Sequence, residues 1–403
     1  MNLPEDFIRE TKQIMGEERF HRFMSAFEED APTSIRLNPL NYQLSTINHK
    51  LSIVPWCPEG FYLAGRPQFT FDPLFHAGCY YVQEAASMFV THVLRSLSTI
   101  NYQLSTILDL CAAPGGKSTA LRTVLPPGSV LVSNEPVPSR AQILLENITK
   151  WGWPDCIVTN NYPRDFRKAK ARFDLILCDV PCSGEGMFRK DPATISEWSL
   201  QNVEKCWRLQ REIVADAWEC LQPGGILIYS TCTFNTKENE ENVRWIMDTY
   251  DAEILSIPTE PDWHITGSLL PGFDGPVYRF IPGITQSEGL FLAVLKKKGD
   301  FSPATRKNLP SGLNVISFDL PHSTFHQELS YTDALRYLRG EALVLPPDTP
   351  RGIVTLTYQG YPLGPAKNIG NRANNLYPKA WRIKTTHLPS EPVSILKPTH
   401  SED

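Results

Sequence analysis

The sequence predicts an α/β protein with a doubly wound, mostly parallel sheet at its centre, a small α+β module before it and a further module after it. Between about residues 80 and 298, short and nearly continuous apolar segments alternate with helical stretches. This alternation is typical of a parallel sheet that helices cover on both faces. Around it, Pro and Gly interrupt shorter strand-like runs, as in small mixed modules. We therefore expect an α+β module, a central domain, a linker and a C-terminal module, at 1–79, 80–298, 299–312 and 313–403.

The expected elements follow from local patterns in chain order. Residues 5–30 place apolar side chains near helical spacing and predict helices. Strand-like runs follow at 34–40 and 54–63. Six apolar segments predict the central strands, at 107–110, 129–135, 156–160, 174–180, 225–232 and 290–297. The last two are expected to pair differently from the others, because the segment between them is rich in Pro and Gly. The final module shows strand signals at 352–360 and 381–384.

The composition is that of an ordinary globular protein: 403 residues, 41% hydrophobic and 21% charged, with a net charge of −5. This charge argues against a protein that coats nucleic acid indiscriminately. The start is acidic, and no apolar run reaches the roughly 18 residues of a membrane span, so we expect a cytoplasmic protein without a membrane partner. The nine cysteines lie singly from Cys57 to Cys232. They predict reduced thiols, and neither a disulfide framework nor a metal site.

The last quarter of the chain has a different charge balance. Residues 301–403 carry eleven Lys and Arg against eight Asp and Glu. Five cations follow one another without an intervening acid, interleaved with Tyr377 and Trp381: Lys367, Arg372, Lys379, Arg382 and Lys384. Cations beside planar side chains suit a phosphate backbone and unstacked bases. The alternative is a solvated surface hairpin, because five charges make a modest patch.

A strand, a loop of small residues and a helix occupy residues 107–125. Gly115 and Gly116 let the backbone approach a ligand closely, and the amide groups that open the helix attract its negative end. A triphosphate-binding loop is disfavoured, because the first glycine of that motif would fall at Cys111. The following strand ends in Glu135, roughly 20 residues beyond the glycines, where an acid accepts hydrogen bonds from both ribose hydroxyls. The loop favours a nucleoside without phosphates, unless Glu135 only caps a helix.

Two cysteines follow two strands of the predicted sheet. Asp179 and Cys182 come at the end of the strand at 174–180, and Cys232 ends the strand at 225–232. In a doubly wound sheet both segments emerge at the carboxyl edge, beside the cofactor loop, where ligands bind. A single cysteine of this kind is usually a small apolar side chain in a core. Two of them at strand ends, each followed by a hydroxyl residue, predict instead that both thiols face one pocket.

Thiols at this edge suit methyl transfer to a carbon atom. Carbon 5 of a pyrimidine has no lone pair, but a thiolate that adds at carbon 6 makes carbon 5 an enamine-like nucleophile that accepts a methyl group from a sulfonium. The carbon 5 proton then leaves and the thiol is eliminated. Asp179 is placed to bond the ring nitrogen or the exocyclic amine, and so to stabilise the charge that develops during addition. The residues alone do not decide which thiol attacks.

Four segments together resemble the NOL1/NOP2/Sun family of RNA 5-methylcytosine methyltransferases, especially its bacterial members that act on small-subunit ribosomal RNA. They are LDLCAAPGGKS, DVPCSGEG and GGILIYSTCTFNTKENEENV in the central domain, and PLFHAGCYYVQEAASM just before it. The tail segment GYPLGPAKNIGNRANNLYPKAWRI is similar to the PUA-like RNA-binding module of those members. The resemblance implies a Rossmann-like class I methyltransferase domain with S-adenosylmethionine as its cofactor.

The resemblance also assigns cofactor contacts by matched position. The methionine part of the cofactor would lie on a loop made of Cys111, Ala112, Ala113, Pro114, Gly115, Gly116 and Lys117. Glu135 would hold the ribose. Where the family often has an acid near the adenine, this chain has Asn161 and Tyr162, and one of these two would take that role. Asp179 would lie between the cofactor and the target base.

The catalytic roles are implied in the same way. Cys232, in the Thr-Cys motif, would be the nucleophile, and Cys182, in the Pro-Cys motif, would assist elimination and release. Lys117 would position Asp179. The implied activity is that of an RNA (cytosine-C5)-methyltransferase acting on 16S ribosomal RNA or the small ribosomal subunit, for which a monomer suffices. A transfer RNA methyltransferase, a non-catalytic ribosome-assembly factor and, from the GGKS segment, a nucleotide hydrolase are the alternatives.

Overall fold

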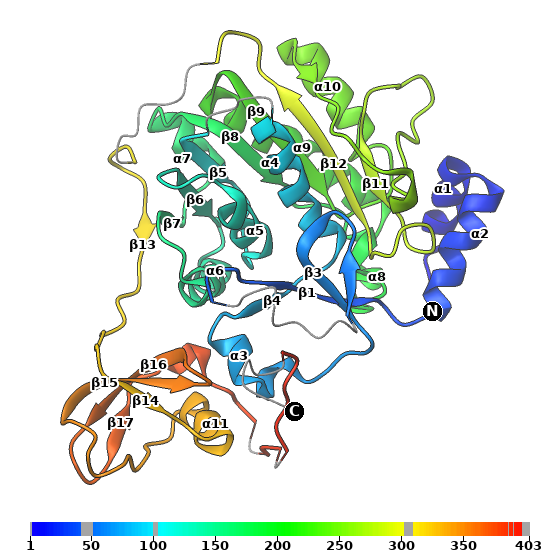
Figure 1. Cartoon of the computed structure of the whole chain (residues 1–403). Coiled ribbons are helices and arrows are strands. Elements are labelled where there is room, and N and C mark those ends of the chain that lie inside the picture. Colours follow the sequence, from blue (N-terminus) through cyan, green and yellow to red (C-terminus); the bar gives the residue numbers. More distant parts are fainter. Residues whose placement is uncertain are drawn as a thin grey trace.

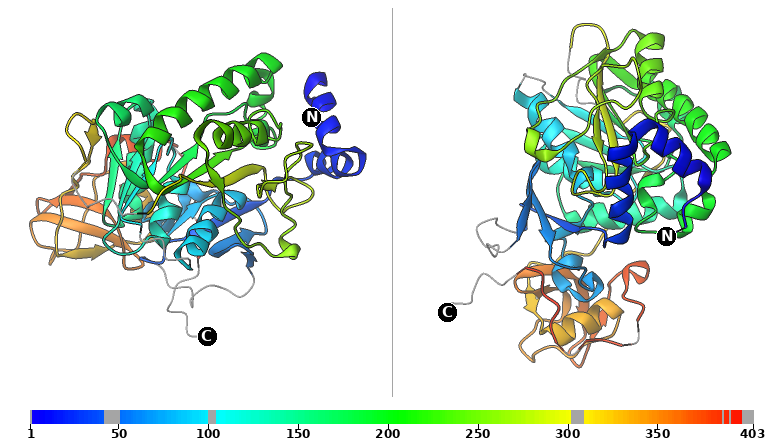
Figure 2. Two further views of the ribbon diagram at one scale, coloured as in Figure 1. Left: turned by 90° about the horizontal axis from the view of Figure 1, so that it is seen from above. Right: turned by 90° about the vertical axis from the view of Figure 1, so that its right-hand side faces the viewer.

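The computed structural model describes residues 2–41, 51–99, 104–301, 309–385, 387–389 and 391–396. Within these residues the chain forms three sheets, which Figure 1 shows from one side and Figure 2 from two more. A nine-stranded sheet occupies the centre, and each flanking module has a four-stranded sheet. Part of the expected linker at 299–312 lies outside the described residues.

The N-terminal module begins with two helices and continues as an antiparallel sheet in the order β2-β3-β1-β4. Gly16, whose φ is +72°, separates the helices, because glycine adopts this backbone conformation without strain. Phe7 and Phe23 pack with Phe188 and Phe234 of the central domain in one buried cluster. The helices and strands expected here are confirmed, with the bounds α1 Glu5–Met15, α2 Glu17–Ser25, η1 Ala26–Glu28, β1 Thr33–Leu37, β2 Ser52–Val54, β3 Cys57–Leu63, η3 Phe69–Phe71, α3 Pro73–His76 and β4 Tyr80–Val82.

The central sheet has the order β10-β12-β9-β8-β5-β6-β7-β13, with β11 paired to β12. In the run β9-β8-β5-β6-β7, each strand is parallel to its neighbours. β12 runs antiparallel to β9, which confirms that the last two predicted strands pair differently. The strand order reverses at β5, and such a switch point is where open α/β sheets bind ligands. The bounds are β5 Thr106–Asp109, β6 Val130–Asn134, β7 Cys156–Thr159, β8 Phe173–Asp179, β9 Leu221–Thr231, β10 Glu253–Ile254, β11 Tyr278–Phe280, β12 Leu290–Lys296 and β13 Val315–Ile316.

Helices cover both faces of this sheet (Figure 1). Leu175 and Leu177 of β8 belong to the core beneath α4 and α5, while Ile176 and Cys178 belong to the core beneath α9 and α10. This alternation is that of a strand buried on both sides, and the predicted doubly wound sheet is confirmed. The bounds are η4 Ala86–Met88, α4 Phe89–Thr99, α5 Gly116–Val124, α6 Pro138–Trp151, α7 Pro163–Lys168, η5 Glu185–Met187, α8 Ala193–Glu197, α9 Leu200–Cys220, α10 Glu240–Tyr250 and η6 Pro261–Trp263.

The C-terminal module is a sheet of order β14-β15-β16-β17 with one helix. It packs against the N-terminal module, and Figure 1 shows α11 beside α3. The Tyr331 hydroxyl donates to the main-chain oxygen of Phe71 at 2.9 Å, and one buried cluster joins Leu335 and Leu356 to Ile35. The bounds are β14 His326–Glu328, α11 Tyr331–Arg339, β15 Gly352–Tyr358, β16 Tyr361–Asn368, β17 Ala373–Asn375 and η7 Lys379–Trp381.

Two strands form pairs across the expected domain boundaries. β4 begins just after the boundary at residue 79 and pairs with β1 in the N-terminal sheet. β13 follows the expected linker and pairs with β7 at the edge of the central sheet. Each flanking module is thus joined to the central domain by a strand as well as by the chain itself.

One predicted strand is wrong. Residues 352–360 contain β15, as expected, but 381–384 form no strand. Trp381 ends the 3-10 helix η7, and the main-chain N of Ile383 donates to the main-chain oxygen of Leu338 at 3.0 Å instead of to a neighbouring strand. Trp381 and Ile383 both pack on the cluster that contains α11. The apolar alternation that indicated a strand therefore reflects packing against this helix.

Candidate active site

The predicted site residues meet at one edge of the central sheet. The parallel strands β5, β6, β8 and β9 end at Asp109, Asn134, Asp179 and Thr231. The cofactor loop follows β5, Glu135 follows β6, and the two cysteine segments follow β8 and β9. Because the carboxyl ends of parallel strands lie at the same edge, these segments surround one site.

Two glycines shape the loop between β5 and α5. Gly115 has a φ of +115°, a conformation that other residues rarely adopt, and α5 begins at the next residue. A Cβ atom on Gly116 would lie 3.3 Å from Cε1 of Tyr81, so glycine lets β4 approach the start of the helix. The main-chain N of Ala112 donates to the main-chain oxygen of Asn134 at 2.7 Å. This bond ties the loop to the end of β6.

Asp109, the last residue of β5, is a site residue that the sequence reasoning missed. Its carboxyl is fully buried, and Oδ2 accepts a hydrogen bond from the Ser118 hydroxyl at 2.6 Å. Oδ1 has no hydrogen-bond partner among the described residues. Burial raises the pKa of Asp109 to about 7. A buried polar atom without a partner marks a position for a further donor, and its signal in the sequence was an acid that ends an apolar strand.

Glu135 is buried at the end of β6. Its Oε1 accepts a hydrogen bond from the main-chain N of Val137 at 3.0 Å, and its Oε2 lies 3.6 Å from Nη2 of Arg140. One carboxylate oxygen therefore caps the turn into α6, as the alternative interpretation expected. The contact of Glu135 with a ribose stays a prediction.

Asn161 and Tyr162 follow β7 and differ in their surroundings. Asn161 is buried, and its side-chain amide pairs with the main chain of Asn314: Nδ2 donates to the oxygen at 3.1 Å, and Oδ1 accepts from the N–H at 2.9 Å. Tyr162 is exposed. Of the two residues considered for the adenine contact, only Asn161 thus lies inside the fold, and its amide has partners from the segment beyond the central domain. The adenine contact stays a prediction.

Lys117 and Asp179 form an ion pair between α5 and the end of β8. Nζ of Lys117 lies 2.8 Å from Oδ2 of Asp179. Burial acts to lower the pKa of the Lys117 ammonium, but the charge and hydrogen bond of Asp179, with a contribution from Cys232, raise it above its ordinary value. The ammonium therefore stays charged and holds one carboxylate oxygen of Asp179.

The two predicted thiols are in contact. Sγ of Cys182 lies 3.1 Å from Sγ of Cys232. The hydrogen bond with Cys232, followed by burial, raises the pKa of the Cys182 thiol well above its usual range. Both effects favour the protonated form of Cys182, and either sulfur of the pair can donate the hydrogen bond.

Two buried carboxyls, absent from the sequence prediction, hold the thiol loops together. Glu185, after β8, accepts hydrogen bonds from the main-chain N of Phe234 at 2.6 Å and of Asn235 at 3.0 Å, both after β9. Glu238 reaches in the other direction and accepts from the main-chain N of Ser183 at 3.0 Å. These acids lie inside the two cysteine motifs, three and six residues beyond the thiols, which is the only signal that the sequence carried.

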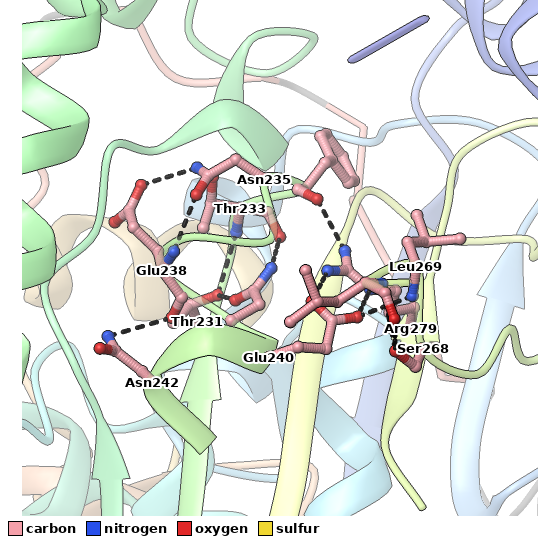
Figure 3. A network of polar contacts seen from close by, with 12 residues as sticks. Thr231, Thr233, Asn235, Glu238, Glu240, Asn242, Ser268, Leu269 and Arg279 are labelled. Atoms are coloured by element: carbon pink, nitrogen blue, oxygen red, sulfur yellow. Dashed lines mark hydrogen bonds and ion pairs between the residues drawn. The ribbon is translucent and has the colours of Figure 1, made fainter. Parts of the chain in front are cut away.

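A second buried network lies next to these loops and is drawn in Figure 3. Arg279 of β11 pairs with Glu240 of α10, and both side chains are buried. Nη1 of Arg279 also donates to the main-chain oxygen of Phe234 at 2.7 Å. Asn239 donates to the main-chain oxygen of Thr233 at 2.9 Å. The backbone after Cys232 is therefore fixed from both sides.

The basic segment of the C-terminal module is only partly as expected. Its cations Lys367, Arg372, Lys379 and Lys384 are exposed, and Arg382 is half-buried. Tyr377, however, is buried in the module's core beside Tyr337, so it is not available to stack on a base. Trp381 is half-buried, with Nζ of Lys150 5.6 Å from its ring centre. The prediction of two stacking aromatic side chains is wrong for Tyr377, because that ring fills the core.

Solved structures with this architecture define the class of protein. A methyltransferase homolog protein from Pyrococcus horikoshii has a TM-score of 0.58 and 26% identity, covering 73% of this chain and 100% of that chain. NSun6 from the same organism, solved with SFG, has a TM-score of 0.61 at 21% identity, covering 74% and 99%, and shows the fold alone. By fold, this protein is a Rossmann-like methyltransferase.

Three family descriptions match successive parts of the chain. They are "N-terminal domain of 16S rRNA methyltransferase RsmF" at residues 3–85, "16S rRNA methyltransferase RsmB/F" at 99–296 and "Methyltransferase RsmF PUA domain" at 324–383. The chain therefore belongs to the RsmB/F family of 16S rRNA methyltransferases, and the resemblance to NOL1/NOP2/Sun proteins is confirmed. Its C-terminal module is a PUA domain.

Curated relatives carry the name ribosomal RNA small subunit methyltransferase F. The protein of Pectobacterium carotovorum is 33% identical over 324 aligned positions, covering 77% of this chain and 66% of that protein. The protein of an Enterobacter species is 28% identical over 467 aligned positions, covering 93% and 95%. The chain thus matches just under two thirds of the length of the first relative. Among the described residues, no helix has both the length and the apolar character needed to span a bilayer.

Proposed function

We propose that this protein transfers a methyl group from S-adenosylmethionine to carbon 5 of a cytosine in 16S ribosomal RNA. One observation carries the proposal: the two thiols lie 3.1 Å apart, at the sheet edge that also bears the cofactor loop. Addition of a thiolate to the ring gives a pair of cysteines at this edge a chemical role. The exposed cations of the PUA domain supply a surface for the RNA backbone.

The residues at the edge fit S-adenosylmethionine. Glu135 offers a buried carboxylate for hydroxyl donors, and Asp109 has a buried oxygen that no hydrogen-bond donor of the described residues reaches. Acceptors of this kind suit ribose hydroxyls and an ammonium group, and the loop after β5 offers main-chain N–H groups to a carboxylate. The bound cofactor supplies an electrophilic methyl group.

The two thiols have different tasks. Sγ of Cys232 adds to carbon 6 of the cytosine, which makes carbon 5 nucleophilic. After methylation a water molecule accepts the carbon 5 proton, the electron pair of that bond forms the double bond between carbons 5 and 6, and the bond between carbon 6 and Sγ breaks as the sulfur leaves with its electron pair. Cys182, which keeps its proton, donates a hydrogen bond to the departing sulfur of Cys232 and so assists elimination.

Asp179 and Lys117 orient the ring. Asp179 is held through Oδ2 by Lys117 at 2.8 Å, which leaves Oδ1 to accept a hydrogen bond from the exocyclic amine or a protonated ring nitrogen. A carboxylate beside a protonated ring nitrogen stabilises the positively charged ring, and this electron-poor ring accepts the thiolate at carbon 6 more readily. Lys117 acts through Asp179 and is a positioning residue.

The wider assignment follows from the same site. We divide the chain into an N-terminal module at 1–79, a methyltransferase domain at 80–298, a linker at 299–312 and the PUA domain at 313–403. One chain supplies both thiols and the cofactor loop, so the protein acts as a monomer. All nine cysteines are free, which suits the reducing cytoplasm, where ribosomal RNA is modified.

Transfer of tritiated methyl groups tests the function. The purified protein is incubated with labelled S-adenosylmethionine and either unmodified 16S ribosomal RNA, small subunits or transfer RNA, and the product is sequenced after bisulfite treatment. We expect one protected cytosine in 16S ribosomal RNA. The Cys232→Ala variant should lose transfer by about a thousandfold or more. Cys206→Ala, which removes a half-buried thiol of α9 outside the pair, should retain it.

Other outcomes select the alternatives. Transfer to transfer RNA alone would make the protein a transfer RNA methyltransferase. RNA binding without transfer to any substrate would support a ribosome-assembly factor and contradict the proposal.

A further inference from the structure

The segment that leads to the PUA domain adds a strand to the cofactor side of the central sheet. β13 pairs antiparallel with β7, with Val315 opposite Thr159 and Ile316 opposite Val158. Continued by one residue, this register places Asn314 beside Asn160, beyond the carboxyl end of β7. The segment therefore reaches the edge at which the site lies. Figure 1 shows the chain running from β13 down to the PUA domain.

Asn314 is held at this edge mainly by its main chain, and its exposed side chain adds one long hydrogen bond, from Nδ2 to the main-chain oxygen of Asn160 at 3.4 Å. Its carbonyl oxygen accepts from the main-chain N of Asn160 at 3.0 Å and from Nδ2 of Asn161 at 3.1 Å. Its N–H donates to Oδ1 of Asn161 at 2.9 Å. The side-chain amide of Asn161 is thus oriented by a residue 153 positions away. A buried amide whose donor and acceptor are both used has one fixed orientation.

The contacts continue from Asn161 to the cofactor loop. The main-chain N of Asn161 donates to Oδ1 of the buried Asn134 at 3.0 Å. Nδ2 of Asn134 donates in turn to the main-chain oxygen of Leu110 at 3.0 Å, and Nδ2 of Asn160 donates to the main-chain oxygen of Glu135 at 2.7 Å. Hydrogen bonds therefore connect this segment with Leu110, where the cofactor loop begins, and with Glu135.

Apolar packing supports the same connection. Ile316 packs on a buried cluster that contains Ala112 and Ala113 of the cofactor loop together with Leu145 and Ile148 of α6. The segment thus rests on the loop's own core as well as on the end of β7.

We propose that residues 313–316 form the wall of the cofactor site on its adenine side, and that Asn314 is a positioning residue that orients Asn161 for cofactor binding. The inference rests on the proposed function. With the methionine part beside β5 and the ribose beside β6, the base at the other end of the nucleoside extends toward the next strand, β7. Occupation of the site and seating of the segment ahead of the PUA domain are then thermodynamically linked, and each stabilises the other.

Titration of the full-length protein with S-adenosylhomocysteine, followed by calorimetry, tests the inference. Asn314→Pro removes the N–H that bonds Asn161, whereas Asn314→Ala keeps the main chain and is the matched control. We expect Asn314→Pro and Asn161→Ala to bind about tenfold more weakly than the wild type. Asn314→Ala should bind as the wild type does. Hydrogen exchange supplies a second readout, in which S-adenosylhomocysteine slows exchange of the amides of residues 313–316 in the wild-type protein.

The outcomes separate this inference from the proposed function. If the wild type binds S-adenosylhomocysteine and Asn314→Pro binds equally well, with unchanged exchange at 313–316, the wall is not part of the site and the inference is overturned. If the wild type itself fails to bind, the cofactor assignment in the proposed function is overturned with it.

Discussion

The two halves of the site are built in different ways. The thiol half comprises the loops after β8 and β9, and its buried carboxyls, Glu185 and Glu238, bond from each loop to the other. The polar groups that join its loops come from the central domain, and Phe234 packs on Phe23 of the N-terminal module. The cofactor half comprises the loop after β5 and the ends of β6 and β7, and it is held by residues from both flanking modules.

Arg36 of β1 shows this dependence from the N-terminal side. It is fully buried, and its guanidinium donates to Thr119 of α5 at 2.6 Å and to Gln83 at 2.8 Å. Burial lowers its pKa to about 10. Asn314 supports the cofactor half from the C-terminal side, because its main-chain N–H donates to Asn161. The comparison teaches that the hydrogen bonds that hold the thiol loops lie within one domain, whereas those that hold the cofactor half also come from the flanking modules.

The largest effect is expected in the thiol half. Glu238 accepts from Ser183 at 3.0 Å, from Gln210 at 2.7 Å and from Asn235 at 2.8 Å. In Glu238→Gln an amide N–H₂ replaces one acceptor and faces these donors, so the loops separate and the thiols lose alignment. Methyl transfer should fall about a hundredfold, the effect of a displacement of about 1 Å. The affinity for S-adenosylhomocysteine should stay unchanged.

The control for this comparison is Asp248→Asn, which neutralises an exposed carboxyl of α10. It should leave single-turnover transfer and affinity at wild-type values. A loss of affinity in Glu238→Gln as large as its loss of transfer would show that the two halves are not independent.

A smaller effect, on stability, is expected in the cofactor half. Burial raises the pKa of Asp109 to about 7, so the folded protein keeps a proton that the unfolded chain releases above about pH 4. The free energy of unfolding should therefore fall as the pH rises from about 4 to about 7, and this contribution should level off above that range, with a slope of at most about 1.4 kcal/mol per pH unit. Asp109→Asn should remove this contribution.

Urea unfolding between about pH 5 and about pH 8 measures the free energy of unfolding of the wild type and the variants at each pH. The free energy of unfolding should fall more steeply with rising pH in the wild type and Asp248→Asn than in Asp109→Asn. Equal slopes in all three proteins would mean that Asp109 is ionised throughout and that its pKa is not raised.

The same division explains what the sequence revealed. Asp179, Cys182 and Cys232 each lie in a short motif at the end of an apolar strand, so the parallel sheet alone brings them to one edge. The ion pair of Lys117 with Asp179 follows from the loop and the strand in the same way. The reacting residues of the thiol half were therefore predictable from contiguous segments, whereas the carboxyls Glu185 and Glu238 in the same motifs were missed.

The cofactor half was less predictable, because its supports lie far away in the sequence. Arg36 is 83 residues from its partner Thr119, and Asn314 is 153 residues from Asn161. Neither residue belongs to a motif or a periodic pattern, and main-chain contacts such as those of Asn314 carry no side-chain signal. Local apolar alternation also misled at 381–384, where burial against a helix has the same pattern as a strand.

The most direct test of the account is covalent trapping on Cys232. Wild-type protein, Cys182→Ala, Cys232→Ala and Cys182→Ala/Cys232→Ala are incubated with S-adenosylmethionine and 16S ribosomal RNA, and the products are separated on a denaturing gel. The account predicts that Cys182→Ala accumulates a protein–RNA adduct, because addition proceeds without assisted elimination, and that the double variant forms none. An adduct that forms in Cys232→Ala and is absent from Cys182→Ala would contradict the assignment of the two thiols.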